Sequence, residues 1–171
     1  NAVDILGAAG LTEKDINPQY QNFDQSADAL KDGKIDAAFI VAGAPTPAIT
    51  ELCMTNAKTR IVPIDGDIAE KLMKDNTFYS GYKIPANAYS NQDKEVTTVT
   101  VKATLIVSAD ATEDDVYKIT KSIFDNIDAI TKEHAKGAEL DLDFAASVTS
   151  VPYHPGAAKY FAEKNITVPT K

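Results

Sequence analysis

The sequence has only one cysteine, Cys53, among its 171 residues. A single thiol can form neither an intrachain disulfide nor a cysteine-based metal site. The sequence also lacks any cluster of lysine and arginine, and its formal net charge is −8. Because nucleic acids and anionic membranes attract basic surfaces, this charge argues against both as partners.

Long apolar runs are also missing, since no stretch approaches the about 20 residues of a membrane span. No signal peptide opens the chain. The first residues, NAVDILGAAG, already follow a helical pattern that closes at Gly10, with no capping segment before it. We therefore expect a fragment of a longer protein, in which Asn1 and Ala2 could also be the remnant of an expression tag.

Motifs for catalysis are absent as well. The sequence contains no Walker lysine and no GxGxxG, GxSxG or HExxH pattern. His134 stands at a polar helix end, where a cation complements the helix dipole, and His154 stands between two prolines, where a packing or capping role is favoured. Asp141 and Asp143 fit a solvated helix face. The sequence thus predicts no enzyme, no metal site and no cofactor, and binding is favoured over catalysis.

What is present is a composition of 44% hydrophobic and 25% charged residues, typical of a globular chain of one or two domains. Hydrophobic periodicity alternates between helix and strand, which indicates an α/β fold. The predicted helices are Ala2–Ala9, Gln25–Lys31, Thr46–Asn56, Asp67–Lys74, Thr112–Ala135, Leu140–Ser147 and Pro155–Asn165. The predicted strands are Gln19–Phe23, Ile35–Val41, Arg60–Ile64 and Val96–Val107.

The turn Gly43-Ala44-Pro45-Thr46-Pro47 follows the predicted strand Ile35–Val41. Gly43 allows a tight exit from the strand, Thr46 suits a helix N-cap, and Pro47 suits the first helical position. Free N–H groups and the positive end of a helix dipole then face outward, an arrangement that suits a carboxylate. The same residues also fit a plain connecting loop, and the spacing does not decide between the two.

Two longer segments suggest how the chain is divided. Tyr79–Tyr89 is a connector rich in tyrosine, in which Tyr79, Tyr82 and Tyr89 suit a cleft wall or ordinary packing. Val96–Val107 is longer than a usual strand, so we expect it to bridge two lobes. The polar stretch SNQDKE, residues 90–95, is the expected domain boundary.

The longest predicted helix opens with a capping box at Thr112. Its apolar side chains recur at the spacing of one helix face and predict a core stripe. The stripe consists of Val116, Ile119, Ile123, Ile127 and Ile130.

Four segments, in this order, resemble the TAXI family of TRAP-transporter solute-binding proteins. They are ADALKDGKIDAAFIVAGAPTPAITEL, IPANAYSNQ, VTTVTVKATLIVSADATEDDVYKITKSIFDN and VPYHPGAAKYFAEKN. The combination of Gly-x-Pro-x-Pro after the strand, the Val-Tyr-Lys-Ile-Thr helix and the terminal His-Pro-Gly-Ala carries the resemblance, which covers nearly the whole chain. The chain resembles the C-terminal half, or more, of the members of that family.

The resemblance implies a type II periplasmic-binding-protein-like fold, in which two α/β lobes close on a ligand. Residues 1–94 would form the second lobe, and residues 95–171 would supply the crossing strand and the C-terminal part of the first lobe. The ligand would be a small organic anion or amino acid, glutamate-like or dicarboxylate-like. The implied partners are TRAP membrane permease subunits driven by an ion gradient, and the implied location is periplasmic or extracellular, with a lipid anchor in a Gram-positive organism.

The candidate ligand-binding residues are Gly43, Ala44, Pro45, Thr46, Tyr79, Tyr82 and Tyr89. Two alternatives remain open at this point: a clamp domain that senses a ligand in a signalling system, and a non-binding fragment of an exported, antigen-like protein. Self-association of the fragment is a further expectation, because the stripe of the long helix would lack the sheet that it normally covers.

Overall fold

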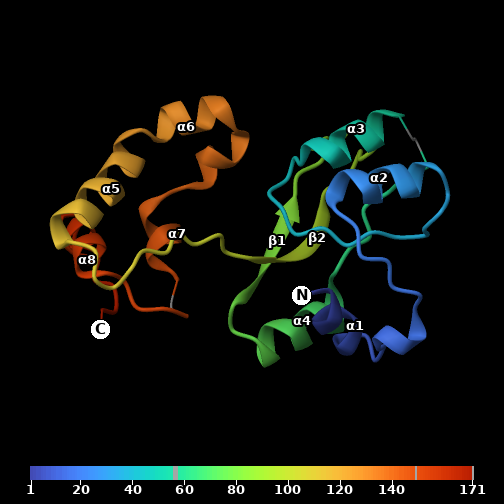
Figure 1. Cartoon of the computed structure of the whole chain (residues 1–171), viewed down its shortest axis with the longest axis horizontal. Coiled ribbons are helices and arrows are strands. Elements are labelled where there is room, and N and C mark those ends of the chain that lie inside the picture. Colours follow the sequence, from blue (N-terminus) through green and yellow to red (C-terminus); the bar gives the residue numbers. More distant parts are fainter. Residues whose placement is uncertain (56–57, 149, 171) are drawn as a thin grey trace. The chain divides into compact units, whose positions relative to one another are not determined.

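The computed structural model describes residues 1–55, 58–148 and 150–170 (Figure 1). The chain divides into two compact units, Asn1–Val101 and Lys102–Lys171. Both helices and strands are present, in agreement with the predicted α/β class. We describe each unit by itself.

The helices of unit 1 lie close to where hydrophobic periodicity predicts them. They are α1 (Ala2–Ala8), the short 3-10 helix η1 (Glu13–Asp15), α2 (Phe23–Lys31), α3 (Pro47–Thr55) and α4 (Gly66–Asp75). Helix α2 begins earlier than predicted because Asn22 and Gln25 form a capping box, in which each side chain accepts a hydrogen bond from the other residue's N–H. Gly10 follows α1 with φ of 77°, the left-handed conformation predicted for it. Asn56, the predicted end of α3, lies outside the described residues.

The sheet of unit 1 has two antiparallel strands, β1 (Tyr79–Ile84) and β2 (Val96–Val101). Tyr79 pairs with Val101 at one end and Ile84 with Val96 at the other. The prediction of a plain connector over Tyr79–Tyr89 was wrong in its first half, which forms β1. The prediction of one strand over Val96–Val107 was also wrong, because β2 ends at Val101, where its partner β1 begins.

Three predicted strands of unit 1 do not form. Gln19–Phe23, Ile35–Val41 and Arg60–Ile64 contain no strand in the structure, apart from the start of α2 at Phe23. Phe39 and Val41 are about half exposed, at 46% and 48%. The apolar pattern supplies side chains for a sheet but does not supply a neighbouring strand for the backbone groups. The Ile64 N–H does reach β2, where it donates to the Thr97 carbonyl at 3.1 Å.

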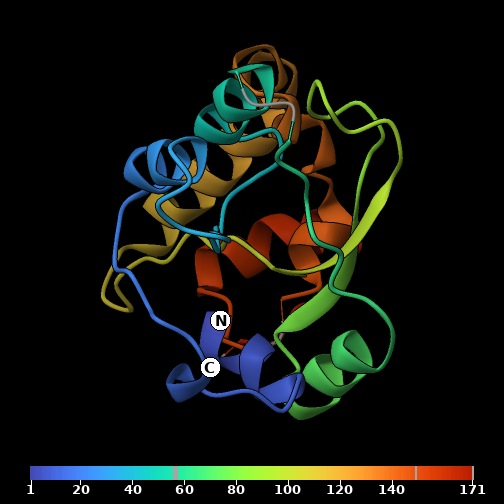
Figure 2. The same ribbon diagram turned by 90° about the vertical axis from the view of Figure 1, so that its right-hand side faces the viewer.

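The core of unit 1 includes Tyr79, the first residue of β1, which is 6% exposed. Helix α4 contacts both α1 and β1, and these three elements lie close together in Figure 2. The Tyr79 hydroxyl lies 2.7 Å from Asp4 Oδ2 and 2.8 Å from Asn1 Oδ1, both at the start of α1. Burial and the hydrogen bond to the Asp4 carboxylate raise the pKa of Tyr79 to about 12. Leu72 of α4, the helix that contacts β1, is almost fully buried.

We expect Tyr79→Phe to reduce the loss of unfolding free energy that accompanies a rise in pH above about 8. The neutral phenol is favoured in the folded state, so its contribution is complete below the unfolded pKa of about 10 and is lost as the pH rises through about 12. Urea unfolding at about pH 8 should show a loss of about 1 kcal/mol in the variant, from the missing hydrogen bond.

Between about pH 8 and about pH 11 the wild type should then lose more stability than the variant. Tyr20→Phe is the control: the Tyr20 side chain is 86% exposed, and its hydrogen bond to Glu13 raises its pKa, but solvent screens this surface contact, so the variant should change the alkaline loss of stability much less than Tyr79→Phe does. Parallel pH dependence in wild type and Tyr79→Phe would contradict the assignment.

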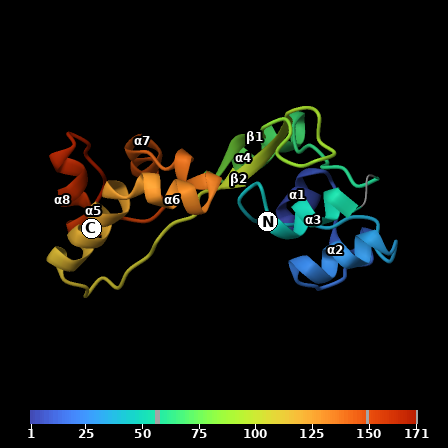
Figure 3. The ribbon, with the colours of Figure 1, turned by 90° about the horizontal axis from the view of Figure 1, so that it is seen from above.

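Unit 2 consists of helices and connecting segments in the part of the chain that the structure describes. They are α5 (Glu113–Asp125), α6 (Ile127–Glu133), the 3-10 helix η2 (Ala135–Glu139), α7 (Leu142–Ala146) and α8 (Pro155–Glu163). Helices α5 and α8 lie side by side in both views (Figures 1 and 3). Stacked rings of Phe124 and Tyr160, with centroids 5.5 Å apart, join them.

The single long helix predicted over Thr112–Ala135 was wrong in one respect, because it breaks at Asn126. The Asn126 side chain donates to the Ser122 carbonyl at 2.7 Å, and its backbone leaves helical geometry with φ of −119° and ψ of 22°. A side-chain amide that hydrogen-bonds to the backbone in this way competes with the helix ladder. The predicted start is confirmed, since the Thr112 side chain accepts the Asp115 N–H. The predicted capping box forms only in this half, because the Asp115 carboxylate accepts from the Thr112 hydroxyl instead of the Thr112 N–H.

Candidate functional site

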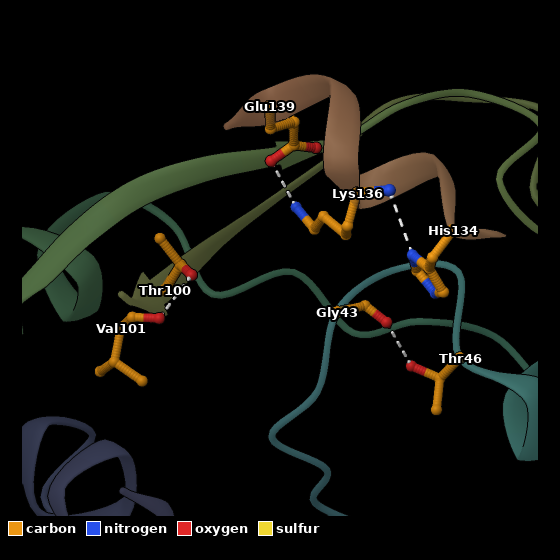
Figure 4. A network of polar contacts seen from close by, with 7 residues as sticks. All are labelled: Gly43, Thr46, Thr100, Val101, His134, Lys136 and Glu139. Atoms are coloured by element: carbon orange, nitrogen blue, oxygen red, sulfur yellow. Dashed lines mark hydrogen bonds and ion pairs between the residues drawn. The ribbon is translucent and has the colours of Figure 1, made fainter. Parts of the chain in front are cut away.

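The loop Gly43–Thr46 is built around internal contacts of its last residue. The Thr46 hydroxyl donates to the Gly43 carbonyl at 2.7 Å (Figure 4), and the Ala44–Pro45 peptide bond is cis. Thr46 is only 8% exposed. Helix α3 then begins at Pro47, as predicted, and its first regular bond runs from the Thr50 N–H to the Thr46 carbonyl.

Tyr89 completes this arrangement from a distant part of the sequence. Its hydroxyl accepts the Thr46 N–H at 3.0 Å, and the tyrosine is 3% exposed. Thr46 thus donates its hydroxyl to the Gly43 carbonyl and its backbone N–H to the Tyr89 hydroxyl, so both of its donors are engaged in contacts within the protein. A direct role of Thr46 in ligand binding stays a prediction, and the next backbone N–H groups at the start of α3 are those of Ala48 and Ile49.

The electrostatics at this helix start favour an anion. Helix α3 has no acidic side chain in its first turn, so the positive end of its dipole is not neutralised from within the helix. Ala48 and Ile49, in the first turn, are half-buried. A carboxylate placed here would accept from their N–H groups.

The other two candidate tyrosines lie elsewhere in unit 1. Tyr79 directs its hydroxyl to the start of α1 and not to the Gly43–Thr46 loop. Tyr82 pairs with Thr98 across the sheet and, by strand alternation, lies on the face opposite to Tyr79. The structure thus brings Tyr89 together with Gly43, Ala44, Pro45 and Thr46, and it separates Tyr79 from them.

Sequence reasoning missed Gln92, a buried amide in the stretch expected to be a polar boundary. Gln92 is 8% exposed, and its Nε2 lies within hydrogen-bond distance of three backbone carbonyls. Nothing in the SNQDKE composition distinguishes Gln92 from its solvated neighbours. The division between the units falls after Val101 and not within this stretch, and the assignment of residues 1–94 and 95–171 to lobes stays a prediction.

The histidines act as helix caps. His154 accepts the Gly156 N–H through Nδ1 at the start of α8, and its Nε2 lies 3.1 Å from the Ala111 carbonyl. His134 accepts the Lys136 N–H at the start of η2, which places it as a cap for the following element. Within the described residues, no group of three or more His, Cys, Asp or Glu side chains is placed to hold a metal ion. Cys53 is buried, and burial raises the pKa of its thiol.

Two hollows of about 510 and about 500 Å³ lie in unit 2 and contain none of the candidate residues. The first lies beside Phe124 and Tyr160 and carries three carboxylates on its lining, Asp125, Asp141 and Asp143. The second follows the exposed side of α5 and α6. Each lining also includes one lysine, Lys164 in the first and Lys118 in the second. Because the candidate residues lie in neither hollow, we place the candidate site at the α3 start, where the first backbone N–H groups of the helix suit an anion.

Comparison with known families identifies the class of protein to which the chain belongs. The profile of the NMT1-like family matches residues 1–164. The chain belongs to this family, which is periplasmic-binding-protein-like and whose members bind solutes. Family members are typically extracytoplasmic. Among the helices of the described residues, none has the length and apolar character needed to cross a bilayer.

Proposed function

We propose that this protein is the extracytoplasmic solute-binding component of a TRAP transporter of the TAXI type. It captures a small organic anion or amino acid, glutamate-like or dicarboxylate-like, and delivers it to a membrane permease driven by an ion gradient. The start of α3, held by the Gly43–Thr46 loop and Tyr89, is the observation that carries the proposal. Membership in a solute-binding family supports it.

In this proposal the ligand lies between two lobes of a type II binding-protein fold. Its carboxylate accepts from the first N–H groups of α3, and closure of the lobes excludes water and strengthens those bonds. The net charge of −8 does not oppose an anionic ligand, because charges beyond about 8 Å are screened in physiological salt. Local donors decide the affinity.

Thr46→Val in the full-length protein, whatever it carries beyond these 171 residues, tests the proposal. Valine keeps the shape of the side chain but leaves the Gly43 carbonyl without its hydroxyl donor, so the loop loses its internal bond. Calorimetric titration with L-glutamate and with succinate should show about a tenfold loss of affinity, near the ~1.4 kcal/mol of one good hydrogen bond.

Thr55→Val is the matched control, because Thr55 makes the same kind of hydroxyl-to-carbonyl bond at the opposite end of α3, to Glu51. Its affinity should equal that of the wild type. If Thr46→Val binds as tightly as Thr55→Val, the loop has no part in binding.

A further inference from the structure

The loop that joins β1 and β2, residues 85–95, is braced from within by one side chain. Gln92 Nε2 lies 3.0 Å from the Pro85 carbonyl, 2.9 Å from that of Lys94 and 3.3 Å from that of Ile84. An amide carries two N–H donors, so three carbonyls share them. The Asn87 N–H donates in return to the Gln92 carbonyl at 2.7 Å. These bonds close the loop on itself.

Burying the Gln92 side chain is unfavourable in itself. Its Oε1 is buried and has no hydrogen-bond partner within the described part of the chain, and burying an acceptor in that state costs free energy. Asn87, in the same loop, adopts a positive φ of 63°, which is uncommon for a residue other than glycine. A loop with two such unfavourable features keeps its conformation only because its other contacts hold it in place.

The same loop contacts the chain before and after α3 in the sequence. Tyr89 accepts the Thr46 N–H just before α3 begins, and Asn91 donates through Nδ2 to the Thr59 carbonyl beyond the point where α3 ends. Tyr89 is buried, and Gln92 also binds the Tyr89 carbonyl through its own N–H at 3.1 Å. Gln92 is thus linked to Thr46 through Tyr89 by its backbone N–H, and its side chain holds that backbone in place by binding the carbonyls of Ile84, Pro85 and Lys94.

We propose that the residue 85–95 loop sets the position of the α3 start, with Tyr89, Asn91 and Gln92 as positioning residues. The effect of this positioning on ligand binding rests on the proposed function, because the N–H groups held in place, those of Ala48 and Ile49, are the ones that would face the ligand carboxylate. Tyr89 then acts through Thr46 and not on the ligand. Because the Lys94 carbonyl is one of the contacts, the α3 start is tied to the chain just before β2, the strand that ends unit 1.

Amide hydrogen exchange in the 171-residue chain, followed by NMR, tests the positioning directly. Tyr89→Phe removes the acceptor of the Thr46 N–H, and Gln92→Leu removes the donors that brace the loop. Both variants should speed exchange at Thr46 by at least about tenfold relative to Leu72, a buried residue of α4 that serves as the internal reference. Tyr20→Phe, an exposed tyrosine of the same unit, should leave the ratio unchanged.

The same variants in the full-length protein should bind L-glutamate or succinate about tenfold more weakly. Equal acceleration at Thr46 and Leu72 would mean that Gln92→Leu only destabilises unit 1, and it would overturn the inference. Weaker binding by Tyr89→Phe with unchanged exchange at Thr46 would also overturn it, since Tyr89 would then contact the ligand. If the wild type binds neither probe, the proposed function fails, and the exchange ratios still decide the positioning.

Discussion

Gly156→Ala is expected to destabilise unit 2 by about 2–3 kcal/mol, the effect of forcing extra volume into a packed helix contact. Gly156 lies in the first turn of α8, where α8 crosses the start of α5. A Cβ at this position would lie 2.2 Å from the Glu113 carbonyl oxygen and 2.8 Å from the Tyr117 nitrogen. Both are backbone atoms, so no side-chain rotation relieves the overlap and the helices must separate.

Urea unfolding monitored by circular dichroism measures this loss. Gly7→Ala is the matched control, because Gly7 is also a helical glycine and a Cβ there would meet no atom within 4 Å. The control should be neutral or stabilised by up to about 1 kcal/mol, from the better helix propensity of alanine. Equal unfolding midpoints for Gly156→Ala and the wild type would contradict the α5–α8 packing described here.

The second large effect concerns ligand binding by the 171-residue chain alone, which we expect to be weak or undetectable. In the proposed clamp, donors converge on the ligand from two lobes, and closure excludes water. A single α3 start provides only one side of such a site. Calorimetric titration of this chain with L-glutamate or succinate should give at least about a hundredfold weaker binding than that of the full-length protein.

The same chain should self-associate through the exposed side of α5 and α6. Val116, predicted to belong to the apolar stripe, is covered, at 4% exposed. Ile119 and Ile130 remain open, at 44% and 36%, and line the hollow of about 500 Å³ with Ile123. Exposed apolar faces of this kind bind a partner. Sedimentation velocity should show species larger than a monomer for the wild type and a monomer for Ile119→Lys.

A monomeric wild type whose affinity matches that of the full-length protein would overturn both expectations. A wild type and an Ile119→Lys variant that associate equally would leave self-association standing but place it on another surface.

Helices were predicted better than strands because a helix satisfies its hydrogen bonds within one segment. The N-cap at Thr112 and the glycine stop at Gly10 are local signals, and both appear in the structure. The break at Asn126 was missed, since an asparagine in a long periodic stretch also fits an uninterrupted helix. Strands depend on a neighbour that the local pattern does not specify, so Ile35–Val41 reads as a strand and yet forms none.

The candidate site was predictable only in its local part. The spacing of Gly43, Pro45 and Pro47 indicated a turn that opens a helix, and the structure has that turn. Composition grouped Tyr79 with Tyr89, although their hydroxyls bind residues far apart in the sequence, Asp4 and Thr46. The role of Gln92 depends on carbonyl groups of the folded backbone, which no pattern of residue types encodes.

Calorimetric titration of the full-length wild type with L-glutamate and with succinate measures whether the protein binds a small carboxylate, which we propose to lie at the start of α3. We expect saturable binding of at least one of the two compounds, weakened about tenfold by Thr46→Val and unaffected by Thr55→Val. Absence of binding to both, or binding that Thr46→Val leaves unchanged, would contradict the proposal.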